Sequence, residues 1–329
     1  AQAESVVDII RAKTDKAMAA AVNQLRGGLS GKVRAVRDRL LEAAAHLEAD
    51  IDFPGLDLEV QTFDQVIAAC QWAIAEVTAM LAGAKQGKLL REGFRVVLAG
   101  RPNVGKSSLL NRLVRENRAI VTEVPGTTRD VIEEWISIQG LPVVIADTAG
   151  IRETADVVEQ LGVDRSRSML ERADLILLVL DATAGVTPED EVLAGLLPAA
   201  TERVVLVNKA DLVDPGERLD VGGPFKNMPL LMVSAETGAG LAEVEGVIAD
   251  AAGLSDQEET LIANARQGEA LRKALNHLES ALETRQAGFG ADLLSIDVRG
   301  AWVSLGEITG ESVGEDLLDQ IFSRFCIGK

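Results

Sequence analysis

The sequence predicts a mostly parallel α/β domain inserted into a discontinuous all-α domain. Residues 1–92 and 255–329 carry apolar side chains at helical spacing, whereas residues 93–254 alternate strand-length apolar runs with helical segments. Neither helical flank has an obvious core of its own, so we expect the two flanks to pack together. The predicted domains are therefore a helical domain in two parts, 1–92 and 255–329, around an inserted domain, 93–254.

Helices are expected over most of residues 3–48 and again toward Leu90, where the apolar positions recur at helical spacing. The glycines at 27–31 are expected to break or bend the first of these helices, because glycine weakens a helix interior by about 1 kcal/mol relative to alanine. Thr62 and Gln65 fit a capping box that would start the next helix.

The inserted domain begins after Gly93, where the apolar pattern changes from helical to strand-like. Thr187 and Pro188 provide an N-cap and a first helical residue, so one helix covering the sheet is expected to start there. The predicted strands are 96–99, 131–138, 143–146, 175–180, 204–207 and 230–233. After residue 255, helices are predicted over 261–282 and 293–305.

Composition limits the classes of partner. The net charge of −18 disfavours broad binding to nucleic acid or to an anionic membrane, and DNA is not an expected partner. Tyrosine is absent and aromatic residues make up 3%, so a stacking platform for single-stranded RNA is not expected. No apolar run approaches eighteen residues and no secretory signal is recognised, which predicts a cytoplasmic protein.

The stretch GRPNVGKSS, residues 100–108, follows an apolar run and precedes a helical segment. In this context backbone N–H groups can surround nucleotide phosphates at the positive end of a helix, as in Ras-like P-loop domains. Lys106 is expected to reach the β- and γ-phosphate oxygens, and the Ser107 hydroxyl to ligate Mg²⁺. The residues expected around the phosphates are Asn103, Val104, Gly105, Lys106, Ser107 and Ser108.

The choice of base is predicted by Asn208, Lys209 and Asp211, which follow a predicted strand as Asn-Lys-x-Asp. Asp211 can accept hydrogen bonds from guanine N1–H and from the exocyclic amine, which adenine does not present in that arrangement. A buried acceptor of this kind can reject the wrong base by roughly 10⁴-fold, because its carboxylate would be left unpaired. Ser234 and Ala235 fit the loop whose backbone N–H meets guanine O6, so GTP is the predicted nucleotide.

A second phosphate-side motif is Asp147, Thr148, Ala149 and Gly150, directly after a predicted strand. Asp147 can hold the hydration shell of Mg²⁺, and the Gly150 amide can contact the γ-phosphate. Thr128, in the stretch GTTRD, is expected to complete the magnesium site. Together the motifs occur in the order expected of a GTP site, which favours function over coincidence.

Hydrolysis requires a group other than the one Ras uses. In Ras-type enzymes a glutamine directly after Asp-x-x-Gly orients the attacking water, and here that position is Ile151. The alternatives that follow it are Arg152, Glu153, Asp156 and Glu159.

The chain resembles the MnmE (TrmE) family of bacterial tRNA-modification GTPases. The resemblance rests on GRPNVGKSS, PGTTRD, DTAGIRE and the terminal FCIGK, and it covers the whole chain. It implies a homodimer that works with the FAD-containing MnmG protein on C5 of the tRNA wobble uridine, with tRNA contacted through the complex. It also implies that a one-carbon folate binds an N-terminal domain, which this chain lacks.

The resemblance further implies that the GTPase domains dimerise across their nucleotide faces when potassium is bound. The matching potassium ligands are Asn103, Thr122, Val124 and Thr127, of which Thr122 and Thr127 also belong to the predicted GTP site. A cation between phosphates would do the work of an arginine finger.

The family glutamate that orients water indirectly matches Glu159, which from its sequence alone could equally be a solvated residue at a helix start. The expected catalytic residues are therefore Lys106, Thr128 and Glu159.

Several other residues have both a functional and a structural interpretation. Cys326 is either a reactive thiol or a plain surface thiol, and Lys329 matches a tail that approaches the family's folate site. His46 and His277 are expected to lie on helix surfaces or to pack between helices. The basic run at 26–39 could touch tRNA or a partner, although a solvated helix face is the commoner explanation.

Two other functions remain open on the sequence. A ribosome-assembly GTPase shares the nucleotide motifs, but it should carry a basic RNA-binding appendage. A G protein that binds GTP without hydrolysing it would act as a switch module.

Overall fold

The computed structural model describes residues 2–52, 59–117, 119, 133–147, 168–214, 222–253 and 264–310. These residues divide into two compact units. The helical unit combines the described parts of 1–10, 18–88 and 257–329, and the sheet unit combines those of 11–17 and 89–256. The domain boundaries predicted from the sequence, at 92 and 254, stay a prediction.

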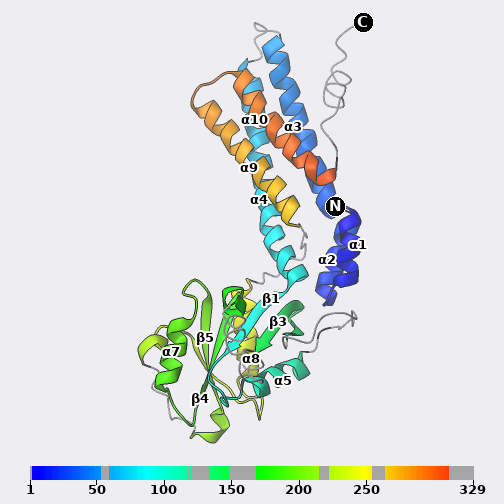
Figure 1. Ribbon diagram of the computed structural model, residues 1–329. Helices are drawn as coiled ribbons and strands as arrows, with labels where there is room; N and C mark the ends of the chain where they lie inside the picture. The colour runs from blue at the N-terminus through cyan, green and yellow to red at the C-terminus, as the bar shows by residue number, and fades with distance from the viewer. Residues whose placement is uncertain are drawn as a thin grey trace, which may run out of the picture. The chain divides into compact units, whose positions relative to one another are not determined.

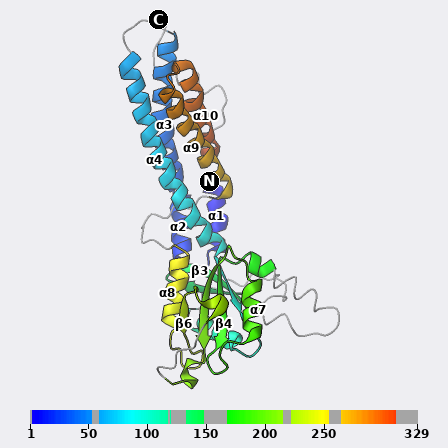
Figure 2. The ribbon, with the colours of Figure 1, turned by 90° about the vertical axis from the view of Figure 1, so that its left-hand side faces the viewer.

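The helical unit is built from both ends of the chain. Figures 1 and 2 both show α3, α4, α9 and α10 running side by side. Its helices are α1 (Gln2–Arg11), α2 (Asp15–Leu25), α3 (Gly28–Asp52), α4 (Glu59–Glu92), α9 (Ala265–Gln286) and α10 (Ala291–Thr309).

One apolar core joins α3, α4, α9 and α10. Leu40 of α3 and Val77 of α4 are fully buried in the same cluster as Leu278 of α9 and Val298 of α10. Neither flank could bury these side chains alone, because each supplies only some of the helices around the core. The predicted discontinuous helical domain is confirmed.

A buried polar group also links the two flanks. Gln267 is fully buried and forms a capping box with Asn264, which begins α9. The Gln267 Nε2 atom donates to Glu4 Oε2 at 3.0 Å, and Gln24 Nε2 donates to Gln267 Oε1 at 3.5 Å. The N-terminal helices are therefore hydrogen-bonded to the residue that caps α9.

One prediction about helix ends was wrong, and another was confirmed in part. The second helix begins at Glu59 rather than at a cap on Thr62. Gly31 lies inside α3, and the break falls at Gly27, whose φ of 92° is unfavourable for any residue with a Cβ. A further break separates α1 from α2, where the Thr14 hydroxyl accepts a hydrogen bond from Ala17 N at 3.2 Å.

The basic run at 26–39 is only in part a solvated face. Arg37 is 6% exposed, and its guanidinium lies 4.1 Å from the centroid of the Trp302 ring. Arg39 covers Trp72 in the same way at 4.7 Å. Because these cations pack on aromatic rings of the helical unit, the predicted solvated face is wrong for Arg37.

The segment Phe63–Glu92 of α4 is long and apolar enough to cross a membrane, contrary to the expectation that no such run exists. Its buried residues Val66, Cys70 and Val77 belong to the core of the helical unit. This face of α4 packs into an apolar core. Burial together with the Asp297 charge also raises the pKa of the Cys70 thiol to about 12, so that thiol is not a ready nucleophile.

The sheet unit holds a six-stranded sheet in the order β2-β3-β1-β4-β5-β6. Only β2 and β3 pair in antiparallel fashion, through a tight turn at Gln139 and Gly140 with φ values of 51° and 82°. The mostly parallel sheet predicted from the sequence is confirmed. Its strands are β1 (Phe94–Ala99), β2 (Glu133–Ile138), β3 (Leu141–Asp147), β4 (Leu175–Asp181), β5 (Glu202–Asn208) and β6 (Leu230–Met232).

Helices lie on both faces of this sheet. Figure 2 shows α7 and α8 on opposite sides of the strands. Alternate residues of β4, including Ile176 and Leu178, pack with Ala194 of α7. The predicted start of α7 is confirmed, since Thr187 is its N-cap and Pro188 its first residue. The helices are α5 (Lys106–Glu116), α7 (Pro188–Leu196) and α8 (Leu241–Ala251).

The parallel strands β1, β3, β4 and β5 end at the same edge of the sheet. In open parallel sheets this edge is where ligands bind, because the loops that leave the strands meet there. The residues that follow these strands therefore form the candidate site.

Close packing of α9 on α10 predicts the effect of a small substitution. A Cβ added at Gly300 would lie 2.7 Å from two atoms of the His277 ring, whereas one added at Gly268 meets only Arg272 Nη2 at 3.8 Å. We expect Gly300→Ala to destabilise the helical unit by about 1–3 kcal/mol, and Gly268→Ala to stabilise it by about 0.5–1 kcal/mol. Urea unfolding followed by circular dichroism measures both, and equal effects would contradict the packing described.

Candidate nucleotide site

The loop between β1 and α5 has a backbone that only glycine can adopt at two positions. Gly100 has a φ of 154° and Gly105 a φ of 94°. A Cβ at Gly100 would lie 2.5 Å from the carbonyl oxygen of Val179, and one at Gly105 would lie 2.2 Å from Asn208 Nδ2. The spacing of these glycines therefore reflects close approaches to β4 and to the residue that ends β5.

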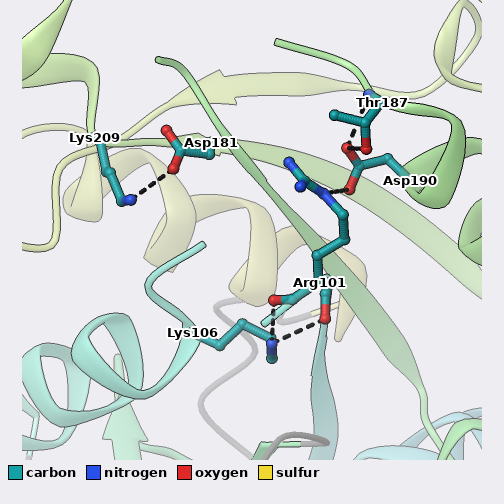
Figure 3. A network of polar contacts seen from close by, with 7 residues as sticks. Arg101, Lys106, Asp181, Thr187, Asp190 and Lys209 are labelled. Atoms are coloured by element: carbon teal, nitrogen blue, oxygen red, sulfur yellow. Dashed lines mark hydrogen bonds and ion pairs between the residues drawn. The ribbon is translucent and has the colours of Figure 1, made fainter. Parts of the chain in front are cut away.

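Lys106 is the first residue of α5 and is 4% exposed. Its Nζ atom donates to the carbonyl oxygens of Gly100 at 2.9 Å and of Arg101 at 2.7 Å (Figure 3). These bonds place the ammonium group across the start of the loop, beside the positive end of α5. Positive charge and helix N–H groups thus gather where phosphate oxygens could be held.

Ser107 and Asp147 lie together at the same edge. The Ser107 hydroxyl donates to Asp147 Oδ2 at 2.7 Å, and Asp147 ends β3, which pairs with β1. A hydroxyl and a carboxylate are oxygen donors of the kind that Mg²⁺ prefers, so this pair fits the predicted magnesium site.

Asn208 joins the phosphate side of the site to the base side. It is 2% exposed; its Nδ2 atom donates to Val104 O at 2.9 Å, and its Oδ1 atom accepts from Ala235 N at 3.0 Å. Both ends of one amide are therefore used to hold two loops that are more than a hundred residues apart in sequence.

Asp211 lies in a short 3-10 turn, Ala210–Leu212, directly after β5. Its Oδ1 atom accepts a hydrogen bond from the Ser234 hydroxyl at 2.5 Å, and Ser234 is fully buried. The structure brings these two predicted base-contacting residues together. Asp211 is exposed on its surface turn, so its carboxylate is accessible to a ligand.

The sequence analysis missed Asp181, which ends β4. Its Oδ2 atom lies 2.6 Å from Lys209 Nζ (Figure 3). Its Oδ1 atom accepts from Thr183 N and Oγ1. Burial acts to raise the Asp181 pKa, but the hydrogen bonds from Lys209 and Thr183 outweigh it and lower the pKa. The sequence did contain a signal for this residue, because Asp181 directly follows the predicted strand 175–180.

Asp190, an acid in the first turn of α7, contacts the phosphate loop. Its Oδ1 atom accepts from Arg101 Nε at 2.8 Å, and its side chain is fully buried. Figure 3 shows Arg101 between this carboxylate and Lys106. No local pattern connects residues 101 and 190, so sequence reasoning had no signal for this pair.

The remaining predicted residues lie outside the part of the chain that the structure describes. Of the predicted potassium ligands, only Asn103 is described, and its φ of 64° places it in the left-handed region. The residues outside the description are Thr122, Val124, Thr127, Thr128, Thr148, Ala149, Gly150, Ile151, Arg152, Glu153, Asp156, Glu159, Cys326 and Lys329.

Comparison with known proteins places this site in a family context. A family model of the MnmE helical domain matches residues 1–326. The chain is 57% identical over 328 residues to the tRNA modification GTPase MnmE of Symbiobacterium thermophilum, covering 100% of this chain and 72% of that protein. It is 49% identical over 340 residues to the protein of the same name from Heliobacterium modesticaldum, again covering 100% and 72%. The crystal structure of Aquifex aeolicus Era bound to GDP and AlF₄⁻ matches 56% of this chain and 67% of that chain, at 28% identity and a TM-score of 0.41.

The contact between Gly105 and Asn208 can be tested against a matched glycine. Gly185 also has a positive φ, 69°, but a Cβ there meets nothing within 4 Å. We expect Gly185→Ala to cost about 1–2 kcal/mol from backbone strain alone, and Gly105→Ala to cost more, because it also displaces the Asn208 amide. Thermal unfolding of the two variants measures the difference, and equal losses would show that Asn208 moves aside freely.

Proposed function

The chain belongs to the MnmE family of tRNA modification GTPases and hydrolyses GTP, and we propose that it does so in wobble-uridine modification as a potassium-dependent dimer. Family membership rests on a match to residues 1–326 and on relatives at up to 57% identity. This full-length match is the observation that carries the proposal. The match over both helical flanks favours tRNA modification over ribosome assembly.

We propose that the phosphates lie along the loop between β1 and α5. Lys106 already bridges two carbonyl oxygens there, and its charge can neutralise developing charge on the β- and γ-phosphate oxygens. Ser107 and Asp147 would hold Mg²⁺ together with Thr128, and the ion when bound would neutralise phosphate charge. Thr148, Ala149 and Gly150 complete the proposed phosphate side of the site.

On the base side, we propose that Asp211 accepts hydrogen bonds from guanine and that the Ala235 loop faces guanine O6. The Asn208 amide holds this loop to Val104 of the phosphate side. Ser234 supports the Asp211 carboxylate through its hydroxyl. Recognition of the base and binding of the phosphates therefore share one hydrogen-bonded frame.

Hydrolysis itself is proposed to depend on Glu159 and on potassium held by Asn103, Thr122, Val124 and Thr127. Glu159 would orient the attacking water, since Ile151 offers no polar group at the usual glutamine position. Potassium held there would supply positive charge to the transition state. Dimerisation across the nucleotide faces would then couple hydrolysis to opening and closing of the GTPase domains.

We also propose that the protein works with the FAD-containing MnmG protein and contacts tRNA through that complex. Lys329 would approach a one-carbon folate bound by the N-terminal folate-binding domain of the family. We propose Cys326 as a reactive thiol. The cytoplasm is the proposed location of this work.

The guanine assignment predicts a change in base preference. We expect Asp211→Asn to weaken GTP binding by about 100-fold or more, because two charge-assisted hydrogen bonds are lost, and to improve binding of xanthosine triphosphate, whose carbonyl can accept from the new amide. Asp214→Asn, on the same exposed segment, is the matched control and should bind GTP normally. Competition binding with the two nucleotides measures both, and unchanged preference in Asp211→Asn would contradict the assignment.

The hydrolysis proposal predicts a strong dependence on the cation. At equal ionic strength we expect GTP turnover to be about 100-fold faster in KCl than in NaCl, and a dimer to form with GDP and aluminium fluoride only in KCl. Glu159→Ala should reduce turnover about 100-fold while nucleotide affinity and dimer formation persist, with Glu153→Ala as the control. Steady-state kinetics and light scattering measure these outcomes.

Equal rates in the two salts would contradict the potassium mechanism. Normal turnover in Glu159→Ala would contradict only the role of that glutamate.

A further inference from the structure

Arg101 is attached to the rest of the sheet unit at both ends. Its backbone carbonyl oxygen accepts a hydrogen bond from Lys106 Nζ at 2.7 Å, and its side-chain Nε atom donates to Asp190 Oδ1 at 2.8 Å (Figure 3). Asp190 lies in the first turn of α7, a helix that carries none of the nucleotide motifs. The phosphate loop is therefore tied to an element outside the predicted site.

Both oxygens of the Asp190 carboxylate accept hydrogen bonds in this arrangement. Its Oδ2 atom accepts from Thr187 N at 3.0 Å and from Thr187 Oγ1 at 2.8 Å, while Oδ1 accepts from Arg101. The Asp190 side chain is 0% exposed and the Arg101 side chain is 20% exposed. A carboxylate buried to this extent requires its partners, so the ion pair differs from the weak pairs found on open surfaces.

The start of the loop is confined on a second side by β4. A Cβ on Gly100 would lie 2.5 Å from the Val179 carbonyl oxygen, so the backbone of the loop touches the strand directly. The carbonyl groups of Gly100 and Arg101 are thus oriented by β4 on one side and by the Asp190 attachment on the other. Those same two carbonyl oxygens hold the Lys106 ammonium group.

We propose that Arg101 and Asp190 are positioning residues for nucleotide binding, which act together by holding the loop in the shape that directs Lys106 toward the phosphates. This inference rests on the proposed phosphate site. Without the pair the loop samples other conformations, and a nucleotide that binds must pay the cost of ordering it again. The effect should fall on affinity more than on turnover at saturating GTP.

The test compares variants that break the pair with one that changes only the exposed neighbouring acid of α7. We expect Arg101→Gln and Asp190→Asn each to weaken binding of fluorescent GDP with Mg²⁺ about tenfold, and the double variant to lose no more than either single variant. Arg101→Lys keeps the charge facing Asp190 and should recover most of the affinity. Glu189→Gln changes the exposed neighbouring acid in the same turn of α7, so it should leave GDP affinity unchanged.

Each outcome decides a separate question. GDP affinity that stays normal in Arg101→Gln and in Asp190→Asn would overturn the inference, as would losses that add in the double variant. If Asp190→Asn fails to fold, the comparison of Arg101→Gln with Arg101→Lys still tests the charge. Lys106→Ala serves as the reference variant. If Lys106→Ala binds GDP with normal affinity, the proposed phosphate site is wrong. If Lys106→Ala loses GDP affinity while the Arg101 variants keep it, only the positioning role is contradicted.

Discussion

The amide of Asn208 is the interaction on which the geometry of the site depends most. Asn208 ends β5 and is buried, and its planar side-chain amide connects the Val104 carbonyl to the Ala235 N–H. Gly105 has to be glycine because this amide occupies the space where a Cβ would lie. The Asn208 amide at the end of β5 thus determines the backbone conformation of the loop that follows β1.

Buried or half-buried carboxylates repeat the same principle along the edge of the sheet. Asp147 ends β3 and holds Ser107; Asp181 ends β4 and holds Lys209. Asp190 begins α7 and holds Arg101. Each acid orients one residue of a nucleotide motif, and each is itself placed by a strand end or a helix start. The rigidity of the candidate site therefore comes from the sheet and from α7 as much as from the motif residues.

Sequence reasoning succeeded where the chemistry was local. The N-cap at Thr187 and the alternation of strands and helices along the chain follow from neighbouring residues, and both were predicted correctly. It failed where a distant group decides the outcome. Arg37 is buried because Trp302, more than two hundred residues away, lies under its guanidinium, and Asp190 is a site residue because Arg101 reaches it. Neither partner can be chosen from a pattern without the fold.

The helical unit places a different constraint on the chain. Its core needs α3 and α4 from one flank and α9 and α10 from the other, and Gln267 joins them through hydrogen bonds to Glu4 and Gln24. The sheet unit is built mainly from contacts within its own stretch of sequence, whereas the helical core closes only when both flanks are present. Long-range closure of this kind carries a larger loop entropy cost. The apolar faces of α3 and α4 therefore depend for their burial on the last helices of the chain, which makes the helical unit the part whose stability rests on the whole sequence.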